Sequence, residues 1–241
     1  MTRILGKFRK GIPGSYSLNF GLPGGKYCSS LCPYKERICY GLKLSKMYLS
    51  AHIGWKNLEN MGGYEVLCRA IKEVKYRIKN NTGGITWFRF NVVGSLPHAN
   101  QRGQRFDKKL IELVRILQKN SIPTHLPVET INKQRFYSKL FRQHKIQQVV
   151  RLSCQTKREW LNFNGPCSFL AGSIGDTAQV RLNKAKQLRI NRRLKFPKRQ
   201  VIVCPAILTN KLLFPQSKGR IKCGQCQACS RKNIDVIYIL H

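Results

Sequence analysis

Seven of the ten cysteines in this chain fall into two compact sets, one near each end. The first set has the spacing C-x3-C-x6-C and consists of Cys28, Cys32 and Cys39. The second has the spacing C-x2-C-x2-C, with one further cysteine upstream, and consists of Cys223, Cys226, Cys229 and Cys204. Thiolate is a soft ligand that selects zinc or iron–sulfur clusters, and short spacings allow one loop to wrap one metal centre. Both sets are therefore candidate metal sites.

The two sets differ in how many thiols they offer to a metal. Four cysteines can close a tetrahedral site, the usual form of a structural zinc centre, whereas three leave one coordination position open. At the C-terminal set we expect structural zinc or an iron–sulfur cluster, with Cys204 as the fourth ligand. At the N-terminal set the spacing fits a four-iron cluster with one iron free for a substrate or cofactor, and a zinc site fits it as well. A single centre shared by both sets is the remaining interpretation.

The chain is strongly basic, with 45 Lys and Arg against 10 Asp and Glu and a formal net charge of +35. Such a surface attracts polyanions, and each phosphate that it neutralises releases condensed counter-ions. We therefore expect a nucleic acid, DNA or RNA, as the partner. No run of about 18 apolar residues is present, so we expect no membrane partner. The first residues lack the apolar core of a signal peptide, and ten cysteines then indicate metal binding in a reducing compartment.

One segment, residues 181–199, concentrates this charge and contains no acidic residue. Its nine basic residues are Arg181, Lys184, Lys186, Arg189, Arg192, Arg193, Lys195, Lys198 and Arg199. Phosphate contact requires dense positive charge, and arginine adds bidentate geometry. A basic run is commonly only a solvated face, but a run without compensating acids repels itself. We expect a stripe that binds a polyanion.

Hydrophobic periodicity places these residues on alternating strands and helices. We expect strands at residues 16–20, 85–94, 122–128, 147–154, 200–204 and 234–240, and helices at residues 64–78, 106–117, 133–144 and 183–194. Repeated strand–helix units predict parallel pairing with right-handed crossovers. The expected fold is α/β, with a partial or complete TIM-like barrel in residues 1–199. A cysteine-rich C-terminal segment, residues 200–241, is expected to be part of the same domain.

The end of the strand at residues 85–94 is a candidate cofactor site. Ligands of parallel α/β proteins bind beyond the carboxyl ends of the strands. Asn91 can hydrogen-bond a ligand there, Gly94 allows the backbone to approach it, and Ser95 follows directly. The alternative interpretation is an ordinary glycine turn at the end of a strand.

The order of these motifs resembles the gene product 88 domain family of bacteriophages and mobile elements. The matching residues are Cys28, Cys32, Cys39 and Tyr40, then Arg89, Asn91 and Gly94, then Arg151 and Ser153, then Cys204 through His241. The resemblance spans most of the chain through short motifs. It implies a phage or mobile-element protein in the cytoplasm of a bacterial host cell.

A more distant similarity is to radical S-adenosylmethionine enzymes, in which a C-x3-C-x2-C loop precedes parallel strand–helix units and holds a four-iron cluster. That similarity implies an iron–sulfur cluster, with S-adenosylmethionine as a candidate cofactor. The leading hypothesis is a metal–thiolate protein that acts on or with nucleic acid, with a radical-type enzyme as its catalytic version. The alternative is a non-catalytic, zinc-stabilised nucleic-acid-binding module.

Overall fold

The computed structural model of the chain describes residues 5–7, 15–20, 61–80, 84–94, 96–97, 103–173, 175–208, 221 and 226–239. The strands are β1 Gly6–Lys7, β2 Ser15–Phe20, β3 Trp87–Gly94, β4 Thr124–Val128, β5 Val150–Cys154, β6 Cys167–Ala171, β7 Gln200–Val203 and β8 Ile234–Ile239. The helices are α3 Gly63–Asn80, α4 Gln104–Lys119, α5 Ile131–Gln143, α6 Lys157–Asn162, α7 Ala178–Lys195 and α8 Pro205–Leu208, with a short 3-10 turn η2 at Ala228–Ser230.

The strands form one sheet in the order β1-β2-β3-β4-β5-β6-β8-β7. β1 pairs antiparallel with β2, and every other pairing is parallel. Strands β2 to β6 follow one another in both sequence and space, and a helix covers each connection from β3 to β7. This arrangement confirms the predicted α/β fold with parallel strand–helix units. It is compatible with a partial barrel.

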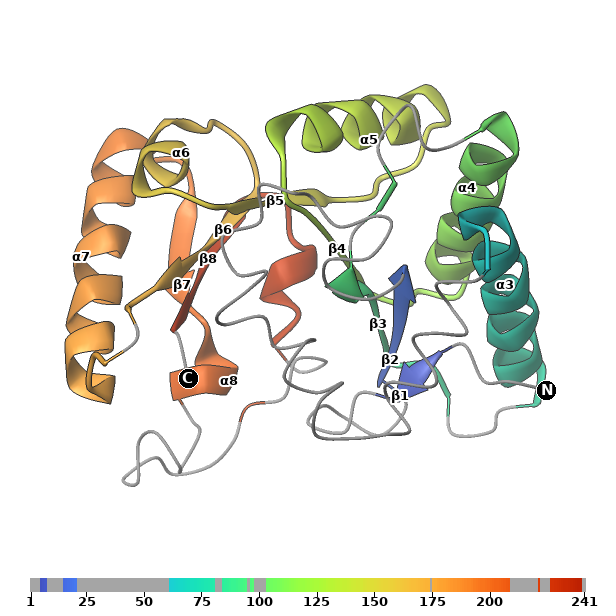
Figure 1. Cartoon of the computed structure of the whole chain (residues 1–241), viewed down its shortest axis with the longest axis horizontal. Helices are drawn as coiled ribbons and strands as arrows, with labels where there is room; N and C mark the ends of the chain where they lie inside the picture. The colour runs from blue at the N-terminus through green and yellow to red at the C-terminus, as the bar shows by residue number, and fades with distance from the viewer. Residues whose placement is uncertain are drawn as a thin grey trace.

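The helices lie along the outer side of the curved sheet, from α3 at one end to α7 at the other (Figure 1). Right-handed crossovers that all advance in the same direction place their helices on the same face. The outer faces of β3, β4 and β5 contribute Phe88, Leu126 and Val150 to one core cluster with buried residues of α3, α4 and α5. A second cluster joins Leu152 of β5 to residues of α6, α7, β7 and β8.

The order in which successive strands are added across the sheet reverses at the last crossover, because β8 lies between β6 and β7. The two strands remain parallel. A right-handed connection that runs backwards must pass over the opposite face of the sheet. The connection from β7 to β8 holds η2, which contacts β4 and β8, and η2 lies on the inner side of the arch in Figure 1. This reversal places Cys226 and Cys229 on the inner face of the sheet, away from α7.

Local capping explains several helix starts. Thr130, Thr156 and Thr177 each accept a hydrogen bond from a backbone N–H of the helix that follows, at α5, α6 and α7. At α6 the Glu159 side chain completes a capping box with Thr156, which satisfies two backbone donors at once. These caps fix where each helix leaves the sheet.

Two elements of the sheet region, α6 and β6, lie between residues 154 and 183, where the sequence predicted no helix or strand. β6 is a five-residue strand, and its pairing with β5 and β8 places it in the middle of the sheet. The strand predicted at residues 200–204 ends one residue earlier, at Val203, and β4 and β5 begin later than predicted. In the described residues, no helix is long and apolar enough to cross a membrane.

Candidate functional sites

α7 presents a row of cationic side chains to solvent. The helix contains seven of the nine basic residues predicted to form the polyanion-binding stripe, and it contains no acid. Lys186, Arg189 and Arg193 are exposed and lie three and four residues apart, so they are neighbours on one flank of the helix. No carboxylate in the described parts of the chain forms an ion pair with any of these three. We call them the α7 basic row.

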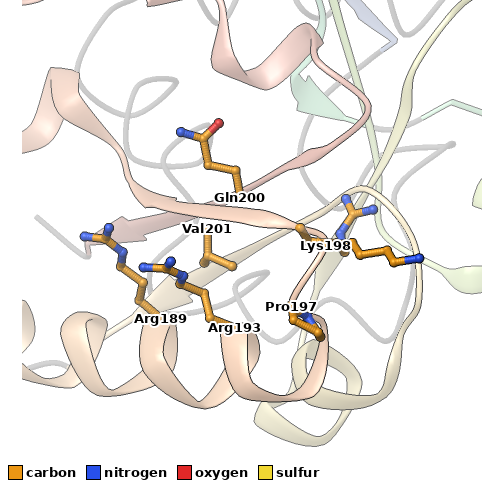
Figure 2. A pocket seen from close by; sticks show the side chains of 7 residues that line it. Arg189, Arg193, Pro197, Lys198, Gln200 and Val201 are labelled. Carbon is orange, nitrogen blue, oxygen red and sulfur yellow. The ribbon is translucent and has the colours of Figure 1, made fainter.

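A pocket of about 350 Å³ continues this row onto the start of β7. It is lined by Arg189, Arg193, Pro197, Lys198, Arg199, Gln200 and Val201. Figure 2 shows the Arg189 and Arg193 side chains rising from α7 next to each other, with Val201 pointing toward them and Gln200 pointing away. Four of the seven lining residues are cationic, so the pocket favours an anion.

Arg192 belongs to the core, and its predicted contact with a polyanion is wrong. Its side chain is 0% exposed. It donates to Asp235 Oδ2 at 2.8 Å and to the backbone carbonyls of Trp160, Phe163 and Gly165. Its guanidinium also stacks on the rings of Trp160 and Phe196, at 4.7 and 4.6 Å. A side chain buried this way ties α7 to α6 and β8 and cannot reach a phosphate.

Arg199 shares the same carboxylate. It donates to both oxygens of Asp235, at 2.7 and 2.6 Å, and to the carbonyl of Lys232 at 3.0 Å. Asp235 is itself fully buried and accepts a further bond from the backbone N–H of Cys167. One buried negative charge therefore serves two arginines, and this group leaves one positive charge uncompensated beside the pocket.

The other basic residues of the predicted stripe differ in their partners. Lys184 forms an ion pair with Asp176 at 2.9 Å, and Lys195 donates to the Asn162 side chain at 2.6 Å. The alkyl part of Arg181 packs over Gly172, which has a φ of +102°. A Cβ at this glycine would lie 2.6 Å from Arg181 Cγ. These three side chains stabilise the N-terminal and C-terminal turns of α7, which leaves the α7 basic row and Lys198 for a ligand.

The described members of the C-terminal cysteine set lie around one small core. Cys204, Cys226 and Cys229 all pack against the buried cluster of Ala228, Ile234 and Val236. Cys204 reaches this cluster from the end of β7, which brings together residues far apart in the sequence. Cys223 lies outside the described residues. Within the described residues, no group of three or more His, Cys, Asp or Glu side chains is arranged to hold a metal ion.

Tyr238 lies beside these thiols on β8. Its hydroxyl is 3.1 Å from Cys229 Sγ. Burial, together with the neighbouring Cys229 and Cys204 thiols, raises the pKa of Tyr238 well above its ordinary value. Tyr238 is thus a neutral phenol that can donate a hydrogen bond to the Cys229 sulfur, the kind of second contact that tunes a ligating thiolate.

Arg151 holds the cysteine-rich segment against the inner face of the sheet. It is fully buried. It donates to the backbone carbonyls of Cys229, Arg231 and Ile234 on one side and of Cys167 on the other, at 2.8 to 3.1 Å. A single guanidinium therefore donates to four backbone carbonyls. The sequence marks Arg151 as a charged residue in the strand predicted at residues 147–154 and as part of the family resemblance, but it does not show these contacts.

His125 occupies the adjoining position on the same inner face. Arg89 on β3 is its direct partner in the strand register. Burial, followed by the positive charges of Arg89 and Arg151, holds the pKa of His125 well below its ordinary value. Its Nε2 is buried and lacks a hydrogen-bond partner in the described part of the chain. The imidazole is therefore neutral at physiological pH.

The N-terminal cysteines Cys28, Cys32 and Cys39 lie outside the described residues, as does Ser95 of the candidate cofactor site. The backbone at Asn91 and Gly94 forms the end of β3, and Gly94 pairs with Phe20 of β2. β2 is the first parallel strand, and Cys28 follows its last residue by eight positions. In the sequence, the segment that carries the first cysteine set therefore follows the carboxyl end of β2.

The two remaining buried cysteines, Cys154 and Cys167, are core residues. They lie on the neighbouring strands β5 and β6 and are 2% and 0% exposed. Burial and a hydrogen bond with Cys154 raise the pKa of the Cys167 thiol. A thiol that resists ionisation is a poor metal ligand and a poor nucleophile.

Comparisons of the chain with models of known protein families, with curated proteins and with solved structures find no match.

Proposed function

We propose that this protein binds nucleic acid through α7 and the start of β7. The observation that carries the proposal is the α7 basic row: three exposed cations on one flank of a helix that has no acid. Adjacent like charges at these spacings destabilise a helix by a few tenths of a kcal/mol per pair. A row of phosphates would remove that repulsion and release counter-ions.

The ion pairs of the chain support this assignment. Eight of the ten acidic residues fall in the described parts, since Glu36 and Glu59 lie outside them. None of the eight forms an ion pair with the row, and the two that pair with other basic residues of the segment 181–199 are Asp176, with Lys184, and Asp235, with Arg192 and Arg199. The excess positive charge therefore remains on the outer surface of α7.

The experiment compares two triple variants in a binding assay with a fluorescent oligonucleotide at low salt. The first is Lys186→Ala, Arg189→Ala and Arg193→Ala. The control removes a matched row from α5, Arg135→Ala, Lys139→Ala and Arg142→Ala, with spacings of four and three and with all three side chains exposed. We expect the α7 variant to weaken binding by at least about tenfold and the α5 variant to weaken it far less. Equal losses of affinity in the α7 and α5 variants would mean that binding depends on the overall charge alone.

A second candidate function is a cluster-dependent enzyme of the radical type. The observation that favours it is the topology: β2 to β6 run parallel in sequence order, and in the sequence Cys28, Cys32 and Cys39 follow the first of them. The resemblance to radical S-adenosylmethionine enzymes implies a cysteine segment that precedes such strand–helix units in a partial TIM-like barrel. A cluster on these three thiols would supply an open iron for S-adenosylmethionine, near Asn91 and Gly94.

Anaerobic reconstitution with iron and sulfide separates this candidate from a zinc-stabilised binding module. The enzyme requires iron–sulfur absorption in the visible range and a paramagnetic signal of the reduced protein that changes when S-adenosylmethionine is added. Zinc bound without any response to S-adenosylmethionine would exclude the enzyme and leave the nucleic-acid-binding module.

The C-terminal cysteines fit a metal–thiolate centre by the chemistry of their donors. Three thiols pack around one small core, and Tyr238 is placed to hydrogen-bond one of them. We propose that Cys204, Cys226 and Cys229 hold zinc or an iron–sulfur cluster together with Cys223. Cys229→Ser should then remove about one metal centre per chain, whereas Cys68→Ser on α3 should remove none. Unchanged metal content in Cys229→Ser would make these thiols core residues.

A further inference from the structure

We propose that the pocket between α7 and β7 binds a terminal phosphate monoester of a nucleic-acid strand. This inference rests on the proposed function and adds to it the part of the polyanion that is recognised. The row along α7 contacts a chain of phosphates, and the pocket at its C-terminal end receives the phosphate that ends the chain.

Several positive charges meet in the small volume of this pocket. Arg189, Arg193 and Lys198 line the pocket, are exposed, and have no acidic partner in the described parts of the chain. The fourth cation, Arg199, shares Asp235 with the buried Arg192, so that group adds one further positive charge. An internal phosphodiester carries one negative charge, whereas a terminal monoester carries about −1.5 to −2 at neutral pH. The pocket therefore matches the monoester better.

The arginines of the pocket wall are held in place by the fold. Arg199 is fixed by its bonds to both oxygens of Asp235 and to the Lys232 carbonyl. Arg189 and Arg193 lie one helical turn apart on α7, which Arg192 ties into the core. The guanidinium groups of Arg189 and Arg193 offer planar, bidentate donors to phosphate oxygens, and Arg199, engaged by Asp235, contributes its charge.

The pocket is small, and part of its lining is uncharged. A volume of about 350 Å³ is at the small end of ligand sites and excludes a duplex from its interior. Pro197 supplies an exposed apolar wall, and the buried Val201, which points toward the arginines in Figure 2, lies beneath it. A phosphate on the arginines would place its sugar against this wall, which suits a strand end.

The experiment measures the affinity for one single-stranded oligonucleotide prepared with a 5′ phosphate, with a 3′ phosphate, or with hydroxyls at both ends. We expect at least one phosphorylated form to bind about tenfold tighter than the hydroxyl form, since a charge-assisted hydrogen bond is worth about a tenfold change or more. Lowering the pH from 7.5 to 5.5 should reduce this preference, because the second pKa of the monoester is about 6.

Single-residue variants test whether the preference for a phosphorylated strand end comes from this pocket. Arg193→Ala and Lys198→Ala should lower the preference for the phosphorylated end to about twofold or less. Lys186→Ala, on the same row but outside the pocket, should weaken all three oligonucleotides equally and leave the preference unchanged. A preference that survives Arg193→Ala and Lys198→Ala overturns the pocket assignment.

The outcomes also separate this inference from the proposed function. Equal, salt-sensitive affinity for all three oligonucleotides overturns the end-recognition inference and leaves nucleic-acid binding by α7 intact. Absence of binding to all three at low salt overturns both.

Discussion

At the scale of single residues, the arginines divide into those that build the fold and those that face a ligand. Neighbours in sequence fall on opposite sides of this division: Arg192 is buried on Asp235, while Arg193 is exposed at the pocket. The periodicity of α7 contains the reason, because Ala185, Leu188 and Arg192 share the buried face of the helix. The basic segment alone does not show which arginines are buried, because this depends on the face of the helix on which each one lies.

Arg192 and Arg193 therefore provide a matched pair for a stability test. Arg192→Ala leaves Asp235 with Arg199 as its only arginine partner and removes the donor of three backbone carbonyls, which together cost about 3–5 kcal/mol. We expect Arg192→Ala to lower the free energy of unfolding by that amount in urea denaturation, and Arg193→Ala to change it by less than about 0.5 kcal/mol. Similar small effects for both variants would contradict the role of Arg192 as a core residue.

His125 predicts a pH dependence of stability. Its pKa is depressed in the folded protein, so at low pH the unfolded chain takes up a proton that the folded chain does not. The free energy of unfolding therefore decreases as the pH falls below about 6.5, the pKa of histidine in the unfolded chain. Between pH 7.5 and 5.5 this loss amounts to about 1.4 kcal/mol.

His125→Gln should remove this component. The variant's free energy of unfolding should change less between pH 7.5 and 5.5 than that of the unmodified protein, as measured by urea denaturation at each pH. His144→Gln is the control, because His144 is exposed on the surface after α5. An identical pH dependence in His125→Gln and the unmodified protein would show that the pKa of His125 is not depressed in the folded state.

At the scale of elements, strong hydrophobic periods were sufficient to predict α3, α4, α5, α7 and most strands. The sequence did not predict β6, because five residues of small and mixed character between Gly165 and Gly172 carry a weak strand signal. Nor could it show that β8 inserts between β6 and β7, since strand order depends on packing rather than on local pattern. That insertion is what moves Cys226 and Cys229 to the inner face.

Arg151 should control how firmly this inner segment is attached. Arg151→Met keeps a similar apolar length but leaves four carbonyls without their donor. We expect faster amide hydrogen exchange in residues 226–234 of the variant than in the unmodified protein, with α4 unchanged. Arg151→Lys preserves the charge but cannot reach all four carbonyls, so it should show an intermediate increase. Unchanged exchange at residues 226–234 in both variants would mean that the thiol cluster alone anchors the segment.

At the scale of the whole molecule, the charge of +35 is distributed unevenly because acidic residues are used in local contacts. Glu65, Glu73, Glu112 and Glu129 each form an ion pair with a Lys or Arg near them in the helical layer, and Glu159 caps α6. Composition could predict a polyanion partner, and the sequence could mark residues 181–199. Only the fold shows that the row on α7 ends in a pocket.

The salt dependence of binding to single-stranded nucleic acid tests directly whether α7 contacts the phosphates. The logarithm of the affinity falls linearly with the logarithm of the salt concentration, with a slope of about −0.7 for each phosphate contact. The triple variant Lys186→Ala, Arg189→Ala and Arg193→Ala should reduce the magnitude of this slope by about 2, since three contacts are lost. The α5 variant Arg135→Ala, Lys139→Ala and Arg142→Ala should keep the slope of the unmodified protein. Equal slopes for the α7 variant and the unmodified protein would contradict binding through α7.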